Sequence, residues 1–335
     1  MVSFANALAP VYGAVDVIAV RQCRDSCDTT SLMRWAMCFA LRIAKYSALV
    51  LLIAPAKLQA GLMPTYQDFD SPGTTYVEGR PGYTSGGILA GGPTGNFMRL
   101  RAADVPDDFS PNSIAFDRTA EGDYVQVVAS FDFSLTPVTG SADGFFFTLL
   151  PTSEYGITGA APVVNWAGGG AAEPRDLEHT FALGFDIFDN NNVNPNPPEP
   201  NNNHISLHYD KNFLGVFDPG FNLDSGGWHS AEVILNRVAG GTSLTLTLTP
   251  AGGSPVTPIS DFLIGGYELT ESRLAMGAST GGESALHDFD NISAQFTAVP
   301  EPGSFALLAT ALVGLAGYDT RRKRMVRTEE ESESR

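Results

Sequence analysis

Groups that could bind a metal ion gather in one segment, "ALGFDIFDNNNVNPNPPEPNNNHISLHYD", residues 182–210. Asp186, Phe188 and Asn190 are spaced two apart at the end of a predicted strand. Strand alternation would put the Asp186 and Asn190 side chains on one side, with the Phe188 carbonyl between them. Glu199 follows in a polar loop. Carboxylate, amide and carbonyl oxygens are the ligands of a hard cation such as calcium. The segment predicts a calcium site, although Asn, Asp and Pro clusters also build ordinary loops.

A further acidic residue, Asp143, stands at the start of the apolar run in "GSADGFFFTLLPT", residues 140–152. The phenylalanines and leucines of this run are typical of a buried strand. A carboxylate beside such a run is costly unless it pairs with a partner or a ligand. We therefore expect Asp143 to have a specific partner at the mouth of the strand.

Two adjacent glycines, Gly281 and Gly282, interrupt the segment "RLAMGASTGGESALHDFDNISAQF", residues 273–296. The pattern predicts a strand, a tight glycine loop and a returning strand. Glycines in such a loop leave backbone N–H groups open to a ligand that approaches closely. An ordinary hairpin loop is the alternative interpretation, and it is the commoner use of paired glycines.

The elements that must position these residues are strands. Alternation with a period of two dominates residues 61–300, as in "YVQVVASFDFSL" (124–135) and "TSLTLTLTP" (242–250). About a dozen strand-like segments are separated by Gly, Pro, Asn and Asp clusters, and no amphipathic helix stands out among them. This density predicts an all-β sandwich or jelly roll, in which residues 61–95 form loop or edge strands.

Composition supports a turn-rich β protein. The 335 residues include 35 glycines and 22 prolines, and 21 phenylalanines provide material for a core. The formal net charge of −17 argues against a nucleic-acid partner, because no basic face is available to neutralise phosphates. The three cysteines, Cys23, Cys27 and Cys38, all precede residue 60. The folded domain is therefore expected to contain no disulfide framework.

The N-terminal region has the order of a secretory signal peptide. Within residues 33–60, basic residues precede the apolar run "YSALVLLIA", and small Ala60 stands at the expected cleavage site. The alternative is an uncleaved membrane anchor. Residues 1–32 would make an unusually long n-region, so translation is expected to start at Met33 or Met37.

The C-terminal segment "VPEPGSFALLATALVGLAGYDTRRKRM", residues 299–325, combines Pro-Glu-Pro, an apolar stretch and a basic cluster. The apolar stretch is shorter than the roughly 20 residues of a stable membrane span. The basic cluster would hold the C-terminus in the cytoplasm. This order resembles the PEP-CTERM sorting signal of Gram-negative bacteria. The resemblance implies export across the inner membrane, recognition by an exosortase and removal of the tail.

Proteins with such signals are associated with the cell surface or an exopolysaccharide matrix. A plain C-terminal anchor is the alternative and would have the same topology. We therefore divide the chain into an N-terminal extension with a signal peptide, a folded domain, a sorting or transmembrane segment and a charged tail: 1–60, 61–298, 299–325 and 326–335.

Three segments of the folded domain together resemble one family. "ADGFFFTLLP" resembles the "ADGFxFFLxP" strand of the L-type lectins, the legume lectins and their secretory-pathway relatives. "FDIFDNN…EPNNNH" resembles their metal loop, and "GASTGGESALHDFDNIS" resembles their "ASTG…H…SWSF" segment. The three occur in the family's order across residues 95–297. The resemblance implies a concanavalin A-like jelly-roll sandwich and non-catalytic, calcium-dependent carbohydrate binding.

The resemblance also assigns roles to matching positions. Asp143 would follow a cis peptide bond from Ala142 and hydrogen-bond two sugar hydroxyls. Asp186 and Asn190 would ligate calcium by their side chains, and Phe188 by its carbonyl. Asn190 would also donate a hydrogen bond to the sugar.

The remaining roles fall on two loops. Glu199, five residues before a histidine, takes the place of the second calcium carboxylate. Gly281, Gly282 and Glu283 fall in the loop that tunes sugar choice. The family usually stacks an aromatic ring on the sugar. Phe188 cannot be that aromatic if its carbonyl is the calcium ligand, which leaves the stacking residue unassigned.

Three positions depart from the family's pattern. Gly184 stands where legume lectins have a Glu ligand for a second, transition metal, so that metal is not expected and His204 would be only a strand residue. Glu199 is one methylene longer than the family's Asp, and Asp189 is the alternative ligand. The family's sugar-binding glycine run reads "TGAA" here and ends at Ala161.

Two other functions remain open at this point. One is a structural matrix β-sandwich that keeps the fold without binding sugar, which the three departures favour. The other is a polysaccharide hydrolase, whose two carboxylates would face each other across a cleft. The clustered "ExDxxE" strand signature of one such enzyme group is absent from the sequence. The expected ligand is a glycan or an exopolysaccharide.

Overall fold

A computed structural model describes residues 65–79, 81, 86–101, 111–118, 121–160, 177–192 and 199–299, together with Gly314 and Tyr318. The predicted signal segment lies outside these residues, as do the sorting segment beyond residue 299 and the charged tail, apart from those two positions. One compact unit spans Gly61–Pro300. No helix within the described ranges has the length and apolar character needed to cross a membrane.

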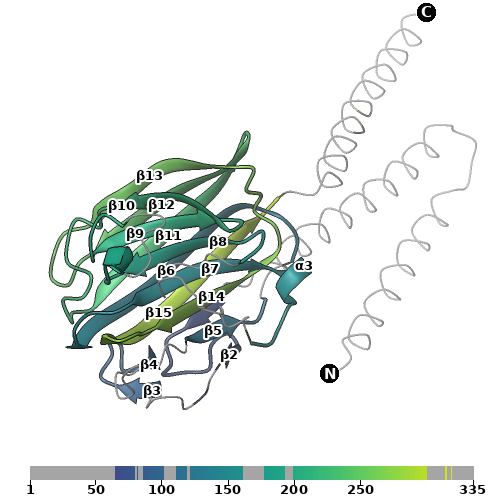
Figure 1. Ribbon diagram of the computed structural model, residues 1–335. Helices are drawn as coiled ribbons and strands as arrows, with labels where there is room; N and C mark the ends of the chain where they lie inside the picture. The colour runs from purple at the N-terminus through teal and green to yellow at the C-terminus, as the bar shows by residue number, and fades with distance from the viewer. Residues whose placement is uncertain are drawn as a thin grey trace, which may run out of the picture. The chain divides into compact units, whose positions relative to one another are not determined.

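The described residues form two antiparallel sheets stacked as a sandwich (Figure 1), which confirms the predicted all-β class. We call them the back sheet and the front sheet. The back sheet has the order β13-β12-β11-β6-β15-β4-β3, with β1 paired to β15. Its strands are β1 (Thr65–Gln67), β3 (Gly87–Ala90), β4 (Asn96–Arg101), β6 (Tyr124–Thr139), β11 (His229–Val238), β12 (Gly241–Thr249), β13 (Val256–Gly265) and β15 (Ser284–Ala298).

The front sheet has the order β10-β9-β8-β7-β14-β5-β2. Its strands are β2 (Tyr76–Glu78), β5 (Asn112–Phe116), β7 (Gly144–Pro151), β8 (Phe181–Asp186), β9 (His204–Tyr209), β10 (Asn212–Phe217) and β14 (Ser272–Ser279). Two short helices accompany it, α3 (Thr152–Tyr155) and the 3-10 helix η3 (Asn190–Asn192).

The core lies between the sheets, where the alternating strands place their apolar side chains. On β6 the inward positions hold Val127, Ala129, Phe131, Phe133 and Leu135, all of them buried. On β12 the leucines of "TSLTLTLTP" are buried and the threonines between them are mostly less so. Period-two alternation is what a sheet with one packed face requires, and the prediction made from it is confirmed.

Strand β7 differs because it is buried on both faces, which explains its continuous apolar run. Phe145 and Phe147 point into the core, where the Phe145 ring stacks on Phe185 at 4.3 Å between centroids. Phe146 and Leu150 belong to a second, smaller cluster on the opposite face of the front sheet. The start of this rigid strand is where Asp143 lies.

The region 61–95 supplies edge strands, one of the two possibilities expected for it. β2 ends the front sheet and β3 ends the back sheet, while β1 pairs beside β15. The segment of the paired glycines is not a hairpin: β14 lies in the front sheet and β15 in the back sheet, so the four-residue loop between them crosses from one sheet to the other.

Candidate functional site

The three sequence segments singled out for chemistry meet at one end of the front sheet. β9, β8, β7 and β14 are successive antiparallel neighbours there. Gly144, the first residue of β7, pairs with Asp186 on one side and Ser279 on the other. Asp186 in turn pairs with His204 at the start of β9. We call this region the loop end of the front sheet.

Asp143 is held on both sides by this register. The peptide bond from Ala142 to Asp143 is cis, as expected. The Asp143 N–H donates to the Ser279 carbonyl at 3.1 Å, and the Asp143 carbonyl accepts from Ile187 N–H at 3.0 Å. Its Oδ2 accepts a hydrogen bond from the Ser279 hydroxyl at 3.3 Å. Backbone bonds therefore fix the residue, and its carboxylate is only half-buried.

The predicted metal loop brings two buried carboxylates close to one short segment. Asp186 is fully buried, and its Oδ1 accepts from Phe188 N–H at 2.7 Å. Glu199 is also buried, and its Oε2 accepts from Asn190 N–H at 2.6 Å. The alternation expected along Asp186, Phe188 and Asn190 is wrong, because β8 ends at Asp186 and Asn190 opens η3. A turn, not a pleat, brings these residues together.

Asn190 and Asn191 complete this loop. The Asn191 side chain donates to the Glu199 carbonyl at 2.7 Å and accepts from Glu199 N–H at 2.9 Å. Asn190 is 8 % exposed, and its Nδ2 has no hydrogen-bond partner among the described residues. Because the O and N of a side-chain amide are assigned only from their partners, an oxygen can occupy that position instead. Two buried carboxylates, an amide and the Phe188 carbonyl are the kinds of oxygen donor that calcium takes.

His204 has a partner within its own loop. Its Nδ1 lies 3.0 Å from the Asn201 carbonyl, and burial lowers the pKa of the imidazole. Within the described ranges, no three His, Cys, Asp or Glu side chains are grouped to hold a metal ion.

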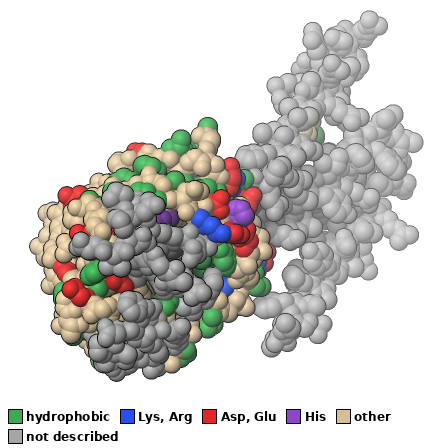
Figure 2. Space-filling model, viewed as in Figure 1, with side chains coloured by type: hydrophobic (Ala, Val, Ile, Leu, Met, Phe, Trp, Pro, Cys, Tyr) green, Lys and Arg blue, Asp and Glu red, His purple; other side chains and the backbone are tan. Residues whose placement is uncertain are grey.

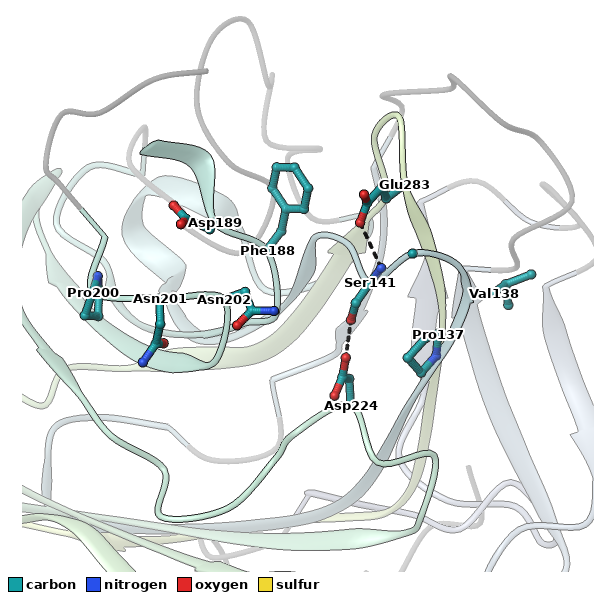
Figure 3. A pocket seen from close by; sticks show the side chains of 11 residues that line it. Pro137, Val138, Ser141, Phe188, Asp189, Pro200, Asn201, Asn202, Asp224 and Glu283 are labelled. Carbon is teal, nitrogen blue, oxygen red and sulfur yellow. Dashed lines mark hydrogen bonds between the residues drawn. The ribbon is translucent and has the colours of Figure 1, made fainter. Parts of the chain in front are cut away.

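An open groove of about 870 Å³ lies beside the metal loop (Figure 3). Phe188 and Glu283 line it, but Asp143 and Asn190 do not. The carbonyl and the ring of Phe188 are separate groups, so a carbonyl that ligates calcium does not exclude the ring from stacking on a sugar, and Phe188 lines the groove. The other lining residues are Pro137, Val138, Gly140, Ser141, Asp189, Pro200, Asn201, Asn202 and Asp224.

The loop between β14 and β15 offers a ligand fewer backbone N–H groups than its two glycines indicate. The Gly281 N–H donates to the Glu283 carbonyl at 3.1 Å, so the expectation that it stays open to a ligand is wrong. Gly282 is exposed, and its N–H has no acceptor among the described residues. Glu283 is exposed as well, and its Oε2 accepts from Ser141 N–H at 3.0 Å.

Ser141 joins three loops at the groove (Figure 3). Its N–H donates to Glu283 and its hydroxyl donates to Asp224 Oδ2. Gly140 permits this approach: its φ is +83°, and a Cβ there would lie 2.3 Å from the Glu283 carboxylate carbon. Neither Ser141 nor Asp224 was identified from the sequence. No local pattern could have identified Asp224, because 83 residues separate it from Ser141.

The "TGAA" segment begins near the opposite end of β14. The buried guanidinium of Arg273 donates to the carbonyls of Tyr155 and Thr158, each at 3.1 Å, and to the Gly159 carbonyl. Burial lowers the pKa of Arg273. This anchor holds the chain as it leaves α3. Ala161 itself lies outside the described residues.

Comparison with known proteins agrees with this architecture. Residues 298–322 match the PEP-CTERM protein-sorting motif, which indicates export and C-terminal processing. No curated protein sequence matches the chain significantly. Among solved structures, the lectin from Bauhinia forficata in complex with GalNAc has a TM-score of 0.51 at 16% identity, covering 71% of this chain and 100% of that one.

A seed lectin from Lotus tetragonolobus is similar to the same extent. Its TM-score is 0.50 at 17% identity, covering 72% of this chain and 100% of the lectin. At this level of identity, the similarity establishes the fold alone. The fold of this chain is the concanavalin A-like sandwich of the legume lectins, and its C-terminus carries a PEP-CTERM motif.

Proposed function

We propose that this chain is an exported, calcium-dependent carbohydrate-binding protein without catalytic activity. One observation carries the proposal: Asp143, the metal loop and a groove walled by the Phe188 ring converge at one end of the front sheet. In a β-sandwich, loops gathered at one end of a rigid scaffold are a favourable place for a binding site.

Calcium would be held by Asp186, Glu199 and the Asn190 side chain, with the Phe188 carbonyl. When bound, the ion would neutralise two buried carboxylates and stabilise the turn that carries Phe188. The chain's own bonds already shape this turn, since Asp186 and Glu199 each accept a backbone N–H from it. A transition metal is not part of the proposal.

The sugar would lie across the loop end of the front sheet. Asp143 would accept hydrogen bonds from sugar hydroxyls: backbone bonds fix its position, and the residue is only half-buried. The Phe188 ring would pack against the apolar face of a sugar. Asn190, Gly282 and Glu283 would supply further polar contacts, whereas Gly281 would shape the loop without donating its N–H.

The sorting motif supports a place for this activity outside the cytoplasm. An exosortase would recognise residues 299–325 at the inner membrane of a Gram-negative bacterium and release the folded domain. The ligand would then be a glycan of the cell surface or of an exopolysaccharide matrix. Display of many copies on a surface would compensate for weak binding at each single site.

Glycan-array binding of the purified protein, in calcium and again with a chelator, tests this proposal. We expect signal on particular sugars that the chelator abolishes. Asp143→Ala should keep the melting temperature and lose the signal, while Asp123→Ala, at an exposed residue just before β6, should keep both. If no sugar binds in either condition, the protein is a structural matrix sandwich. Release of sugar products would identify a hydrolase instead.

A further inference from the structure

The carboxylates at the loop end of the front sheet fall into two sets. Asp186 and Glu199 are buried beneath the metal loop and do not line the groove. Asp189, Asp224 and Glu283 line the groove, and we call them the groove carboxylates. A bound calcium ion would neutralise the first set and leave the charge of the second set facing a ligand.

Each groove carboxylate has one engaged oxygen. Glu283 accepts the Ser141 N–H at Oε2, Asp224 accepts the Ser141 hydroxyl at Oδ2, and Asp189 accepts the Asn191 N–H at Oδ1. The described residues donate no hydrogen bond to the other oxygen of any of the three. The engaged oxygens fix the direction of each carboxylate, and each second oxygen can accept a hydrogen bond from a donor on a ligand.

The described part of the groove wall carries no positive charge to balance them. Of the described residues that line the groove, none is Lys, Arg or His. The chain as a whole carries 37 acidic against 20 basic residues, and Figure 2 shows acidic side chains at several places on the visible face with few Lys or Arg. Such a surface attracts cations over a distance and disfavours anionic ligands.

The Phe188 ring adds a second feature that suits a cation. It lines the same groove as the carboxylates (Figure 3), and an aromatic face attracts an ammonium group through its quadrupole. Hydroxyls of a neutral sugar could also donate to the open oxygens, but three carboxylates without a basic residue are more than a neutral ligand requires.

From this arrangement we infer that the groove selects a cationic sugar, an amino sugar whose amine is free and protonated. The inference rests on the proposed carbohydrate-binding function and narrows its ligand class. The ammonium would lie against Glu283 and Asp224, opposite the ring of Phe188. Uronic acids, which carry a negative charge, would be the class the groove rejects.

Matched sets of sugars on an array test the inference. Glucose, galactose and mannose cores are each presented as the neutral sugar, the 2-amino sugar, the N-acetylated amino sugar and the uronic acid. The full chain is applied in calcium at a pH of about 6, where aliphatic amines are protonated. For the core that binds, we expect the amino form to bind at least about threefold more tightly than its N-acetylated form, and the uronic acid most weakly.

The double variant Glu283→Gln/Asp224→Asn should remove this preference: the ratio of amino-sugar to N-acetylated-sugar affinity should fall toward one, whatever the absolute affinity for either form. Glu232→Gln, an exposed glutamate on β11, is the matched control and should keep the preference. Equal or tighter binding of the neutral or uronic forms by the parent protein overturns the inference and leaves the proposed function intact. A preference that persists in the double variant overturns the assignment to these carboxylates. Absence of binding to every sugar overturns the proposed function itself.

Discussion

Two acidic regions of this sandwich show how differently carboxylates can be treated within one fold. On the back sheet lie Asp132, Asp288 and Asp290, which we call the β15 acidic cluster. At the loop end of the front sheet lie the groove carboxylates, Asp189, Asp224 and Glu283. The first set lies on the neighbouring strands β6 and β15, whereas the second set lies in loops.

In the β15 acidic cluster both oxygens of every carboxylate are engaged. Arg99 binds Asp288 with two donors at 2.6 and 2.7 Å. Asp290 accepts hydrogen bonds from Thr94 and from the Asn291 N–H. Asp132 accepts hydrogen bonds from the Ser230 hydroxyl and from the Asn291 side chain. In the groove only one oxygen of each carboxylate is engaged. Acids with both oxygens engaged hold the fold, whereas we propose that the half-engaged ones face a ligand.

Removal of Arg99, the cation paired with Asp288 of the β15 acidic cluster, should produce the largest loss of stability. Arg99→Met leaves the Asp288 carboxylate buried without its counter-charge, which should cost about 3 kcal/mol of unfolding free energy. Urea unfolding measures it. Arg99→Met/Asp288→Leu, which removes both charges, should recover much of the loss. A loss below about 1 kcal/mol in the single variant would mean that the pair does not hold the sheet.

Gly140 tests whether the groove depends on the close approach of Glu283. Gly140→Ala should cost about 1–2 kcal/mol because φ is +83°, and its Cβ should also displace Glu283 and weaken sugar binding. Gly252 has φ +66° and open space around it, so Gly252→Ala should carry the backbone cost alone and leave binding unchanged. Equal binding by the two variants would show that the Glu283–Ser141 contact does not shape the groove.

Mild acid should destabilise the protein through its buried histidines. Burial lowers the pKa of His204 and of His229, so the unfolded chain takes up these protons first. The contribution of these neutral histidines to the free energy of unfolding is therefore fully present above about pH 6.5. It declines as the pH falls toward their folded-state pKa values. Burial raises the pKa of Asp288 and Asp290, so these acids work in the opposite sense and do not drive the loss.

Melting temperatures between about pH 8 and pH 5 measure this effect. His229→Phe, at a position packed between the rings of Phe133 and Phe221, should flatten the profile even if it lowers stability throughout. An unchanged slope in that variant would assign the acid sensitivity to other groups.

The smallest change in the free energy of unfolding is expected from neutralising two of the groove carboxylates. Glu283→Gln/Asp224→Asn keeps an acceptor oxygen for both Ser141 bonds, so the unfolding free energy should stay within about 0.5 kcal/mol of the parent value. Urea unfolding of this variant beside Arg99→Met gives the comparison directly. A loss as large as that of Arg99→Met would place the groove carboxylates among the structural acids.

Much of the loop end could be predicted from the sequence, because its segments keep a recognisable order. The cis bond before Asp143 and the place of Glu199 beside Asn190 were both expected and are present. Period-two alternation predicted the β-sandwich, since one packed face per sheet imposes that pattern.

The parts that could not be predicted depend on contacts between distant segments. Asp224 reaches Ser141 from the loop after β10, and nothing in its local sequence indicates this. Paired glycines do not reveal that their loop crosses between sheets, or that the Gly281 N–H is used within the loop. The expected pleat at Asn190 failed because β8 stops at Asp186, and strand ends are set by pairing with neighbours.

Calcium titration followed by melting temperature tests most directly whether the loop end is built for ligands and the β15 acidic cluster is not. We predict a saturable rise for the parent protein, equivalent to about 2.7 kcal/mol at a hundredfold excess over the dissociation constant. Asp186→Asn should abolish the rise, and Asp132→Asn, in the β15 acidic cluster, should retain it. No rise in the parent protein, or its loss in Asp132→Asn alone, would contradict the account.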